Sequence, residues 1–122
     1  MQPVLDKHCV SCHSGDKPKG DVTLTAEPEG HYTKSYNALV ERVPFSDQGN
    51  AEAISQPGRF GALGSPVMQK LLAGHHEVKL TAEDTERLAT WMDANALFYG
   101  TFDPADQARQ LLAEHIEGPK LE

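Results

Sequence analysis

The feature that most constrains this chain is a pair of cysteines followed at once by a histidine. Residues 6–15 read DKHCVSCHSG, so Cys9, Cys12 and His13 form a C-x-x-C-H pattern, and the chain has no other cysteine. Two thiols and an imidazole at this spacing are typical of three kinds of site. They are a redox dithiol, half of a structural zinc site, and a covalent attachment site for haem.

The first two interpretations fit the remaining sequence poorly. A redox C-x-x-C pair is typical of a strand–helix–strand setting, and no alternating strand pattern longer than DVTLT at residues 21–25 is present. A structural zinc site needs four nitrogen or sulfur ligands, and the chain has no second C-x-x-C pair, although His75 and His76 could supply the missing ligands. C-x-x-C-H is itself the signature of covalent haem attachment. The sequence therefore favours haem.

The spacing of the motif suits that attachment. Residues three and four positions apart on a helix share one face. A first helix that begins near residue 2 would therefore point Cys9, Cys12 and His13 the same way. Each thiol could add to one vinyl group of a porphyrin while the imidazole faces the iron. We expect one haem c per chain, held covalently by Cys9 and Cys12, with His13 as the proximal iron ligand.

Composition agrees with a cofactor at the centre of the fold. The chain has 122 residues, enough for one small domain, and only 7% of them are aromatic. A large apolar ring would supply the core that such a chain lacks. Seven of the ten glycines and four of the eight prolines lie between residues 14 and 64, so this part is predicted to be mostly loop, with one short helix at Ser35–Arg42.

Three further helices are predicted from capping signals. Ser65 can cap a helix that ends at Gly74, Thr81 can cap the next, and a tail helix can begin at Asp103. The positions expected to be buried are Val67, Met68, Leu71 and Leu72 in the first of these helices, and Leu88, Trp91, Met92, Asn95 and Ala96 in the second. The predicted fold is all-α, with three to four short helices and long loops wrapped around one covalently bound haem.

Three segments after the haem motif carry a more specific resemblance. They read GDVTL at 20–24, PGRFGALGSPVMQKLLAGHHEVKLT at 57–81 and RLATWMDANALFYG at 87–100. With the motif they resemble the class I mono-haem c-type cytochromes, and in this order they are similar to the haem c domains of the hydrazine synthase alpha subunit and related large periplasmic multidomain proteins. The resemblance implies a haem domain at residues 1–100 and a C-terminal helical tail at 101–122. It does not carry over hydrazine chemistry, because function belongs to sites and not to folds.

The resemblance implies electron transfer and not catalysis, although the chain could belong to a larger oxidoreductase. A haem iron with two protein ligands has no open position for a substrate and only passes single electrons. An alternative is an open or displaceable sixth ligand, with the iron binding or reacting with peroxide, NO or CO. The sequence shows no clear distal acid–base pair for that role. A docking module with a mainly structural haem is a third interpretation.

His75 is predicted to be the second iron ligand. It follows Gly74, where a left-handed turn can swing the chain toward the haem. It also matches the histidine of the G-H-x-x-V-K-L piece shared with the resembling domains. His76 does not match, and packing within its helix accounts for Met68. Both remain alternative ligands.

Two further residues are candidate haem contacts. Arg59 could pair with a haem propionate through its guanidinium or could simply be solvated. Trp91 could place its indole N–H on a propionate or could be an ordinary core residue. The backbone carbonyl of Pro18 or Pro28 could orient His13 through its Nδ1–H.

Net charge and hydropathy indicate which classes of molecule this chain can bind. A formal net charge of −7 argues against nucleic acid and favours redox protein partners with a basic docking face. No stretch approaches the roughly 20 apolar residues of a membrane span. Haem attachment of this kind resembles periplasmic maturation. We therefore expect an exported, periplasmic protein whose signal or upstream domains are not in this sequence. A domain of a larger periplasmic protein is one form that such a protein takes.

Overall fold

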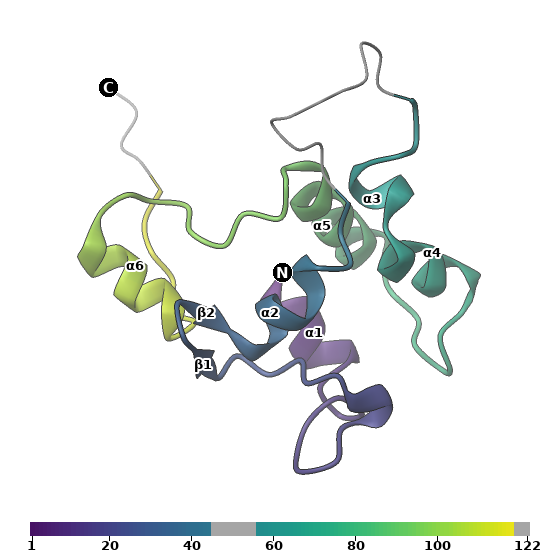
Figure 1. The fold of residues 1–122 in the computed structure, drawn as a ribbon, viewed down its shortest axis with the longest axis horizontal. Helices are drawn as coiled ribbons and strands as arrows, with labels where there is room; N and C mark the ends of the chain where they lie inside the picture. Colours follow the sequence, from purple (N-terminus) through teal and green to yellow (C-terminus); the bar gives the residue numbers. More distant parts are fainter. Residues whose placement is uncertain (45–55, 119–122) are drawn as a thin grey trace.

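The structure is a computed structural model that describes residues 1–44 and 56–118 (Figure 1). Helices dominate its regular structure, which agrees with the prediction of a small helical fold. The helices of this part of the chain are α1 (Gln2–His8), α2 (Lys34–Val40), α3 (Gly61–Gly64), α4 (Pro66–Ala73), α5 (Ala82–Asp93) and α6 (Pro104–Leu111). A 3-10 turn, η1 (Lys19–Asp21), and two short strands, β1 (Pro28–Glu29) and β2 (Tyr32–Thr33), complete the order.

The core lies where α1 and α3 meet α5, and α4 packs against α3 (Figure 1). Leu88 and Met92 lie one turn apart on α5 and are almost fully buried, because residues at i and i+4 share one helix face. The main cluster contains Val4, Val43, Ala62, Met68, Leu88, Met92 and Ala96. A second, smaller cluster consists of Leu5, Leu24 and Leu39, and Trp91 packs against both.

The predicted caps are confirmed. The Ser65 hydroxyl accepts from the Met68 amide at 3.5 Å and the Thr81 hydroxyl from the Asp84 amide at 3.1 Å. Asp103 caps α6 through one carboxylate oxygen, which accepts two backbone amides. Each bond satisfies an amide that a helix start leaves without an intrahelical partner. The predicted tail helix therefore forms, although residues 119–122 of the expected tail lie outside the described residues.

The first helix is shorter than predicted. We expected the helical face to continue through His13, but α1 ends at His8 and residues 9–13 form a turn. The carbonyl of Leu5 accepts both the Cys9 amide at 2.8 Å and the Val10 amide at 3.0 Å. Because one carbonyl receives two successive amides, the regular i to i−4 ladder stops there. The spacing of the motif is then set by a turn in which the Cys9 carbonyl accepts the Cys12 and His13 amides at 3.1 and 3.0 Å.

Two of the expected core positions are exposed. Leu72 is 67% exposed although it lies one turn after the buried Met68 on the same face of α4, because it stands in the last turn of that helix, which ends at Ala73. Asn95 is exposed because α5 ends at Asp93 and the chain then enters left-handed conformations at Asn95 and Ala96, with φ of 61° and 49°. The predicted stripe therefore ends one turn early, although Ala96 is still buried.

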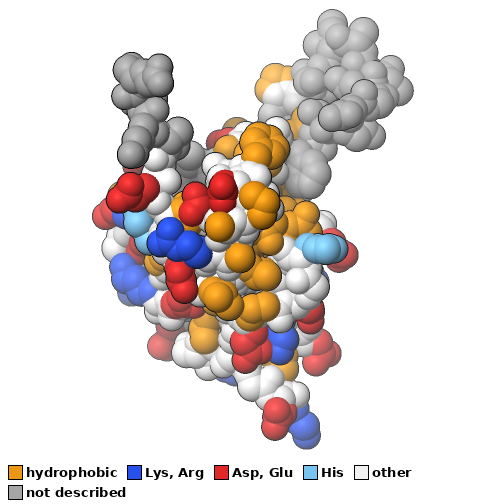
Figure 2. Space-filling model, turned by 90° about the vertical axis from the view of Figure 1, so that its left-hand side faces the viewer, with side chains coloured by type: hydrophobic (Ala, Val, Ile, Leu, Met, Phe, Trp, Pro, Cys, Tyr) orange, Lys and Arg blue, Asp and Glu red, His pale blue; other side chains and the backbone are white. Residues whose placement is uncertain are grey.

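The hairpin and α6 lie on the side of the molecule away from α3 and α4 (Figure 1). The strands pair antiparallel, with Glu29 opposite Tyr32, around Gly30 at a φ of 68°. Gln110 of α6 accepts a hydrogen bond from the Gly100 amide at 3.1 Å. Figure 2 shows a band of hydrophobic side chains on this face, with acidic and basic groups beside it. No helix in residues 1–44 or 56–118 has the length and apolar character needed to cross a membrane.

Candidate functional site

A cavity of about 400 Å³ lies where the C-x-x-C-H turn, the segment around η1 and the loop after α4 meet. The loop after α1 and the loop between α4 and α5 extend to the same side of the molecule (Figure 1). The cavity is lined by Leu5, His8, Cys9, Cys12, His13, Lys19, Gly20, Val22, Leu24, Leu39, Arg42, Pro66, Val67, Lys70, Leu71, His75, His76 and Val78. Its volume lies within the usual range of cofactor pockets, about 300 to 1,000 Å³.

The two cysteines of the motif both line this cavity as free thiols. Cys9 is half-buried and Cys12 is exposed. Burial raises the pKa of the Cys9 thiol, and the neighbouring Cys12 raises it further. Cys9 is therefore held in its protonated form near neutral pH. The structure brings together the motif residues that were predicted to act together.

His13 is oriented by a backbone carbonyl. Its Nδ1 lies 3.1 Å from the carbonyl oxygen of Val22. Because a carbonyl only accepts, Nδ1 carries the hydrogen and Nε2 keeps a free lone pair. The Leu24 amide also donates to the His13 carbonyl at 2.8 Å, so the GDVTL segment is bonded to His13 at two points. The expected carbonyl of Pro18 or Pro28 is thus replaced by that of Val22.

His75 also lines the cavity, and its ring lies near that of His13. The two ring centroids are 6.1 Å apart and the ring planes differ by 21°. Gly74 has a φ of 99°, the left-handed conformation that the sequence predicted. Partial burial lowers the pKa of His75, and the nearby His76, Lys70 and His13 lower it further. The neutral imidazole, which is the form that binds metals, is favoured as a result.

The spacing of these two histidines fits a metal ion held between them. A bond from an imidazole nitrogen to a metal ion is about 2 Å and that nitrogen lies roughly 1 Å from its ring centroid, so two imidazoles on opposite sides of one ion have centroids roughly 6 Å apart. The observed 6.1 Å between His13 and His75 matches this value. The apolar walls formed by Leu5, Leu24 and Leu39 suit a flat apolar cofactor around such an ion.

The alternative ligands differ in position. Met68 is 3% exposed within the main core cluster and does not line the cavity. His76 does line it, with its ring centroid 4.6 Å from that of His75. The described residues contain no group of three or more His, Cys, Asp or Glu side chains placed to hold a metal ion.

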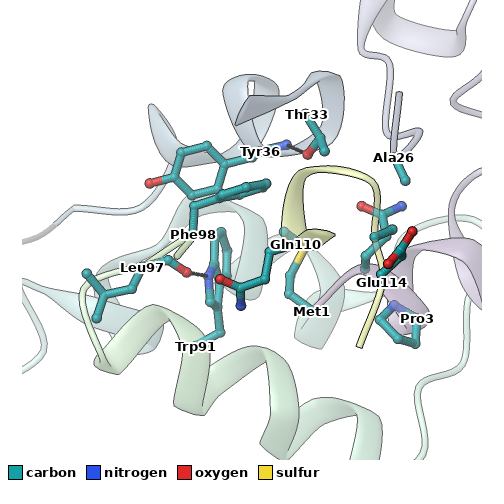
Figure 3. A pocket seen from close by; sticks show the side chains of 12 residues that line it. Met1, Pro3, Ala26, Thr33, Tyr36, Trp91, Leu97, Phe98, Gln110 and Glu114 are labelled. Carbon is teal, nitrogen blue, oxygen red and sulfur yellow. Dashed lines mark hydrogen bonds between the residues drawn. The ribbon is translucent and has the colours of Figure 1, made fainter. Parts of the chain in front are cut away.

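Neither Arg59 nor Trp91 lines this cavity. The Arg59 guanidinium carbon lies 5.5 Å from the centroid of the Phe60 ring. The Trp91 indole N–H donates to the Leu97 carbonyl at 3.0 Å, and Trp91 lines a second cavity of about 280 Å³ (Figure 3). The predicted haem contacts therefore lie outside the residues that line the motif cavity, although Trp91 packs against the cluster of Leu5, Leu24 and Leu39 that lines it.

The cations that do line the cavity were not predicted. They are Lys19, Arg42 and Lys70. The helix pattern could have predicted Lys70 as a lining residue. It lies three residues after Val67 and one before Leu71 on the same helix, and both of these residues line the cavity. No local signal marks Lys19 or Arg42, which reach the cavity from a turn and from the end of α2.

Comparison with known proteins gives no guide to this site. No family model, curated protein or solved structure matches the chain. The function is therefore inferred from the motif and from the residues that line the cavity.

Proposed function

We propose that this chain is a mono-haem c-type cytochrome domain that transfers single electrons between redox partners. The observation that carries the proposal is the pair His13 and His75, whose rings lie 6.1 Å apart on the cavity that also contains both cysteines of the C-x-x-C-H motif. The helical content and the loops around this cavity agree with a class I cytochrome c-like fold. The proposal concerns electron transfer and not catalysis.

Cys9 and Cys12 would attach the cofactor covalently. Each S–H would add across one vinyl C=C, forming a carbon–sulfur bond while the hydrogen goes to the other vinyl carbon, with no net oxidation or reduction. Thioether bonds would then fix the ring beside the turn at residues 9–13.

His13 and His75 would hold the iron. The Val22 carbonyl holds the His13 ring so that Nε2 is the free nitrogen, an arrangement that orients metal-ligating histidines in general. His75 is favoured as a neutral ligand because its pKa is lowered by partial burial and nearby cations. When bound, the haem supplies a one-electron change at iron. Two imidazole ligands leave no open position for a substrate.

The basic residues at the cavity would neutralise the propionates. Lys19, Arg42 and Lys70 line it, whereas Arg59 does not. Ammonium and guanidinium groups form charge-assisted hydrogen bonds with carboxylates. We assign the propionate contacts to these residues in place of Arg59 and Trp91.

The partner and location are part of the same proposal. The net charge of −7 favours a redox partner with a basic docking face. Covalent haem attachment of this type would take place after export to the periplasm, where the chain could be one domain of a larger protein.

The test is to express the chain with a haem c maturation system in the periplasm. After denaturation and extraction with acidic acetone, the haem should stay with the polypeptide. Cys9→Ala combined with Cys12→Ala should release it. Haem that separates from the unsubstituted chain would contradict covalent attachment. Addition of CO to the ferrous protein should leave its spectrum unchanged, whereas a CO adduct would favour the alternative with a displaceable sixth ligand.

A further inference from the structure

Five aromatic side chains form a continuous cluster beside the second cavity, away from the C-x-x-C-H motif. They come from β2, α2, α5 and the segment after α5, and they are Tyr32, Tyr36, Trp91, Phe98 and Tyr99. The ring centroids of Trp91 and Tyr36 are 6.3 Å apart, and those of Tyr36 and Tyr32 are 4.6 Å apart. Phe98 packs edge-on against Tyr36 at 5.0 Å. Figure 3 shows Trp91, Tyr36 and Phe98 together on one wall of the second cavity.

We propose that this cluster is a relay that carries a one-electron oxidising equivalent from Trp91 through Tyr36 to Tyr32 at the surface. Indole and phenol are the aromatic side chains that lose an electron most easily, and electron tunnelling falls steeply with distance. Neighbouring rings in this series lie within the range of direct aromatic contact, about 4.5 to 7 Å. Phe98 packs edge-on against both Tyr36 and Tyr32, with ring centroids 5.0 and 5.3 Å away, but is not itself oxidised.

The two ends of the relay, Trp91 and Tyr32, lie in different surroundings, and these surroundings suit the transfer of an oxidising equivalent from the interior to the surface. At the inner end, Trp91 packs against the cluster of Leu5, Leu24 and Leu39, which also lines the His13 cavity. Trp91 and the proposed cofactor site therefore both contact the cluster of Leu5, Leu24 and Leu39. At the outer end, Tyr32 is 37% exposed and can meet a water-soluble reductant. An indolyl radical oxidises a phenol near neutral pH, so the equivalent moves outward.

The steps balance in electrons and protons. A diffusing radical oxidant, of the class of the azide or carbonate radical, takes one electron from Trp91 and becomes the corresponding anion. The indole N–H then leaves its hydrogen bond to the Leu97 carbonyl and releases its proton to solvent through the cavity of about 280 Å³ that Trp91 and Tyr36 both line. Tyr36 then gives an electron to the indolyl radical and its phenolic proton to solvent, while Trp91 regains a proton. Tyr32 then reduces the Tyr36 phenoxyl radical in the same way, by giving it an electron while Tyr32 loses its own phenolic proton. A thiol or ascorbate in solution finally gives one electron and one proton to Tyr32.

The starting state of the relay is the protonated phenol. Burial raises the pKa of Tyr36, and the neighbouring Tyr32 raises it further. Each transfer between rings is therefore the exchange of one electron together with one proton, and no net charge is left in the cluster.

The relay can be tested by pulse radiolysis with azide radicals on the full chain, with any free thiol alkylated. Azide radicals oxidise indole in preference to phenol, and Trp91 is the only tryptophan, so the indolyl absorption reports this residue alone. The indolyl band should decay as a phenoxyl band grows, at a rate independent of protein concentration. Tyr36→Phe should abolish that growth, and Tyr99→Phe should leave its rate unchanged because Tyr99 is not between Trp91 and Tyr32.

Phenoxyl growth that survives Tyr36→Phe at the same rate would overturn the relay, as would its absence from the unsubstituted chain. Tyr32→Phe provides a second check that does not depend on Tyr36. In this variant the phenoxyl radical should still form, but ascorbate should quench it more slowly because Tyr36 is less exposed than Tyr32. Equal quenching rates would contradict Tyr32 as the outer end. These absorption signals need no bound haem, so the outcome of this experiment is independent of whether the cytochrome proposal is correct.

Discussion

The imidazole rings of His13 and His75 lie with their centroids 6.1 Å apart and their planes within 21° of each other, although 61 residues separate them in the chain. The Val22 carbonyl orients the first ring, and the turn at Gly74 positions the second. Because the two rings share one cavity with both cysteines, they are the most direct target for substitution.

Substituting His75→Ala should open the iron to CO and make the ferrous haem high-spin, because one of the two proposed imidazole ligands would be lost. The optical spectra of the ferric and ferrous protein, with and without CO, measure this. His76→Ala is the matched control, since His76 lines the same cavity and should not be a ligand. A CO adduct in the His76 variant alone would assign the ligand to His76 instead.

Met68 should affect stability and not the spectrum. It is 3% exposed in the main core cluster, so Met68→Ala should lower the free energy of unfolding by about 2 to 5 kcal/mol. Met68→Leu keeps most of the volume and should cost less than about 1.5 kcal/mol. Urea denaturation measures both changes. A sulfur-to-iron charge-transfer band that Met68→Leu abolishes would make Met68 the ligand.

Asp84 should make the fold sensitive to acid. Its carboxylate accepts hydrogen bonds from Lys7 and His8, both at 2.8 Å, and joins the end of α1 to the start of α5. The hydrogen bonds from Lys7 and then His8 hold the pKa of Asp84 well below its usual range. A depressed pKa means that this stabilisation is complete above the unfolded pKa of about 3.9 and is lost as the pH falls toward the folded value.

Asp84→Asn should therefore be less stable than the unsubstituted chain at neutral pH, and the difference should shrink progressively below about pH 4. Denaturant unfolding across this pH range measures it. Glu83→Gln is the control, because the Glu83–Arg87 pair is largely exposed and such pairs contribute little. A difference that stays constant down to pH 2 would show that the carboxylate charge is not responsible.

Gly61 should be sensitive to a single added methyl group. It has a φ of 63°, and a Cβ atom there would lie 2.2 Å from a carboxylate oxygen of Asp93. The same oxygen accepts a hydrogen bond from the Ala62 amide at 2.8 Å and ties α3 to α5. Gly61→Ala should cost roughly 2 to 3 kcal/mol, from left-handed strain plus the disturbed bond.

Gly58→Ala separates these two costs. Gly58 has a φ of 76°, but an added Cβ would meet no atom within 4 Å. Only the conformational cost of about 1 kcal/mol is expected there. Thermal or urea unfolding of both variants provides the comparison. Equal losses would mean that the Asp93 contact contributes nothing.

The sequence by itself determined the features whose physical cause is local. A cap joins a side chain to an amide two or three residues later, so Ser65, Thr81 and Asp103 could be assigned without knowledge of the fold. The left-handed turn at Gly74 is equally local. The spacing of the two cysteines and the histidine in the C-x-x-C-H pattern is also local, and it indicates covalent haem attachment. The haem itself remains a prediction.

Only the tertiary structure decided which distant groups share the cavity. Val22 orients His13, and Lys19 and Arg42 line the cavity, because the chain folds back across the motif. The indole N–H of Trp91 is bound to a backbone carbonyl six residues later, so its ring joins the aromatic cluster and not the cavity. Helix periodicity identifies which face of a helix is apolar, but the group that covers this face depends on how all the elements pack together.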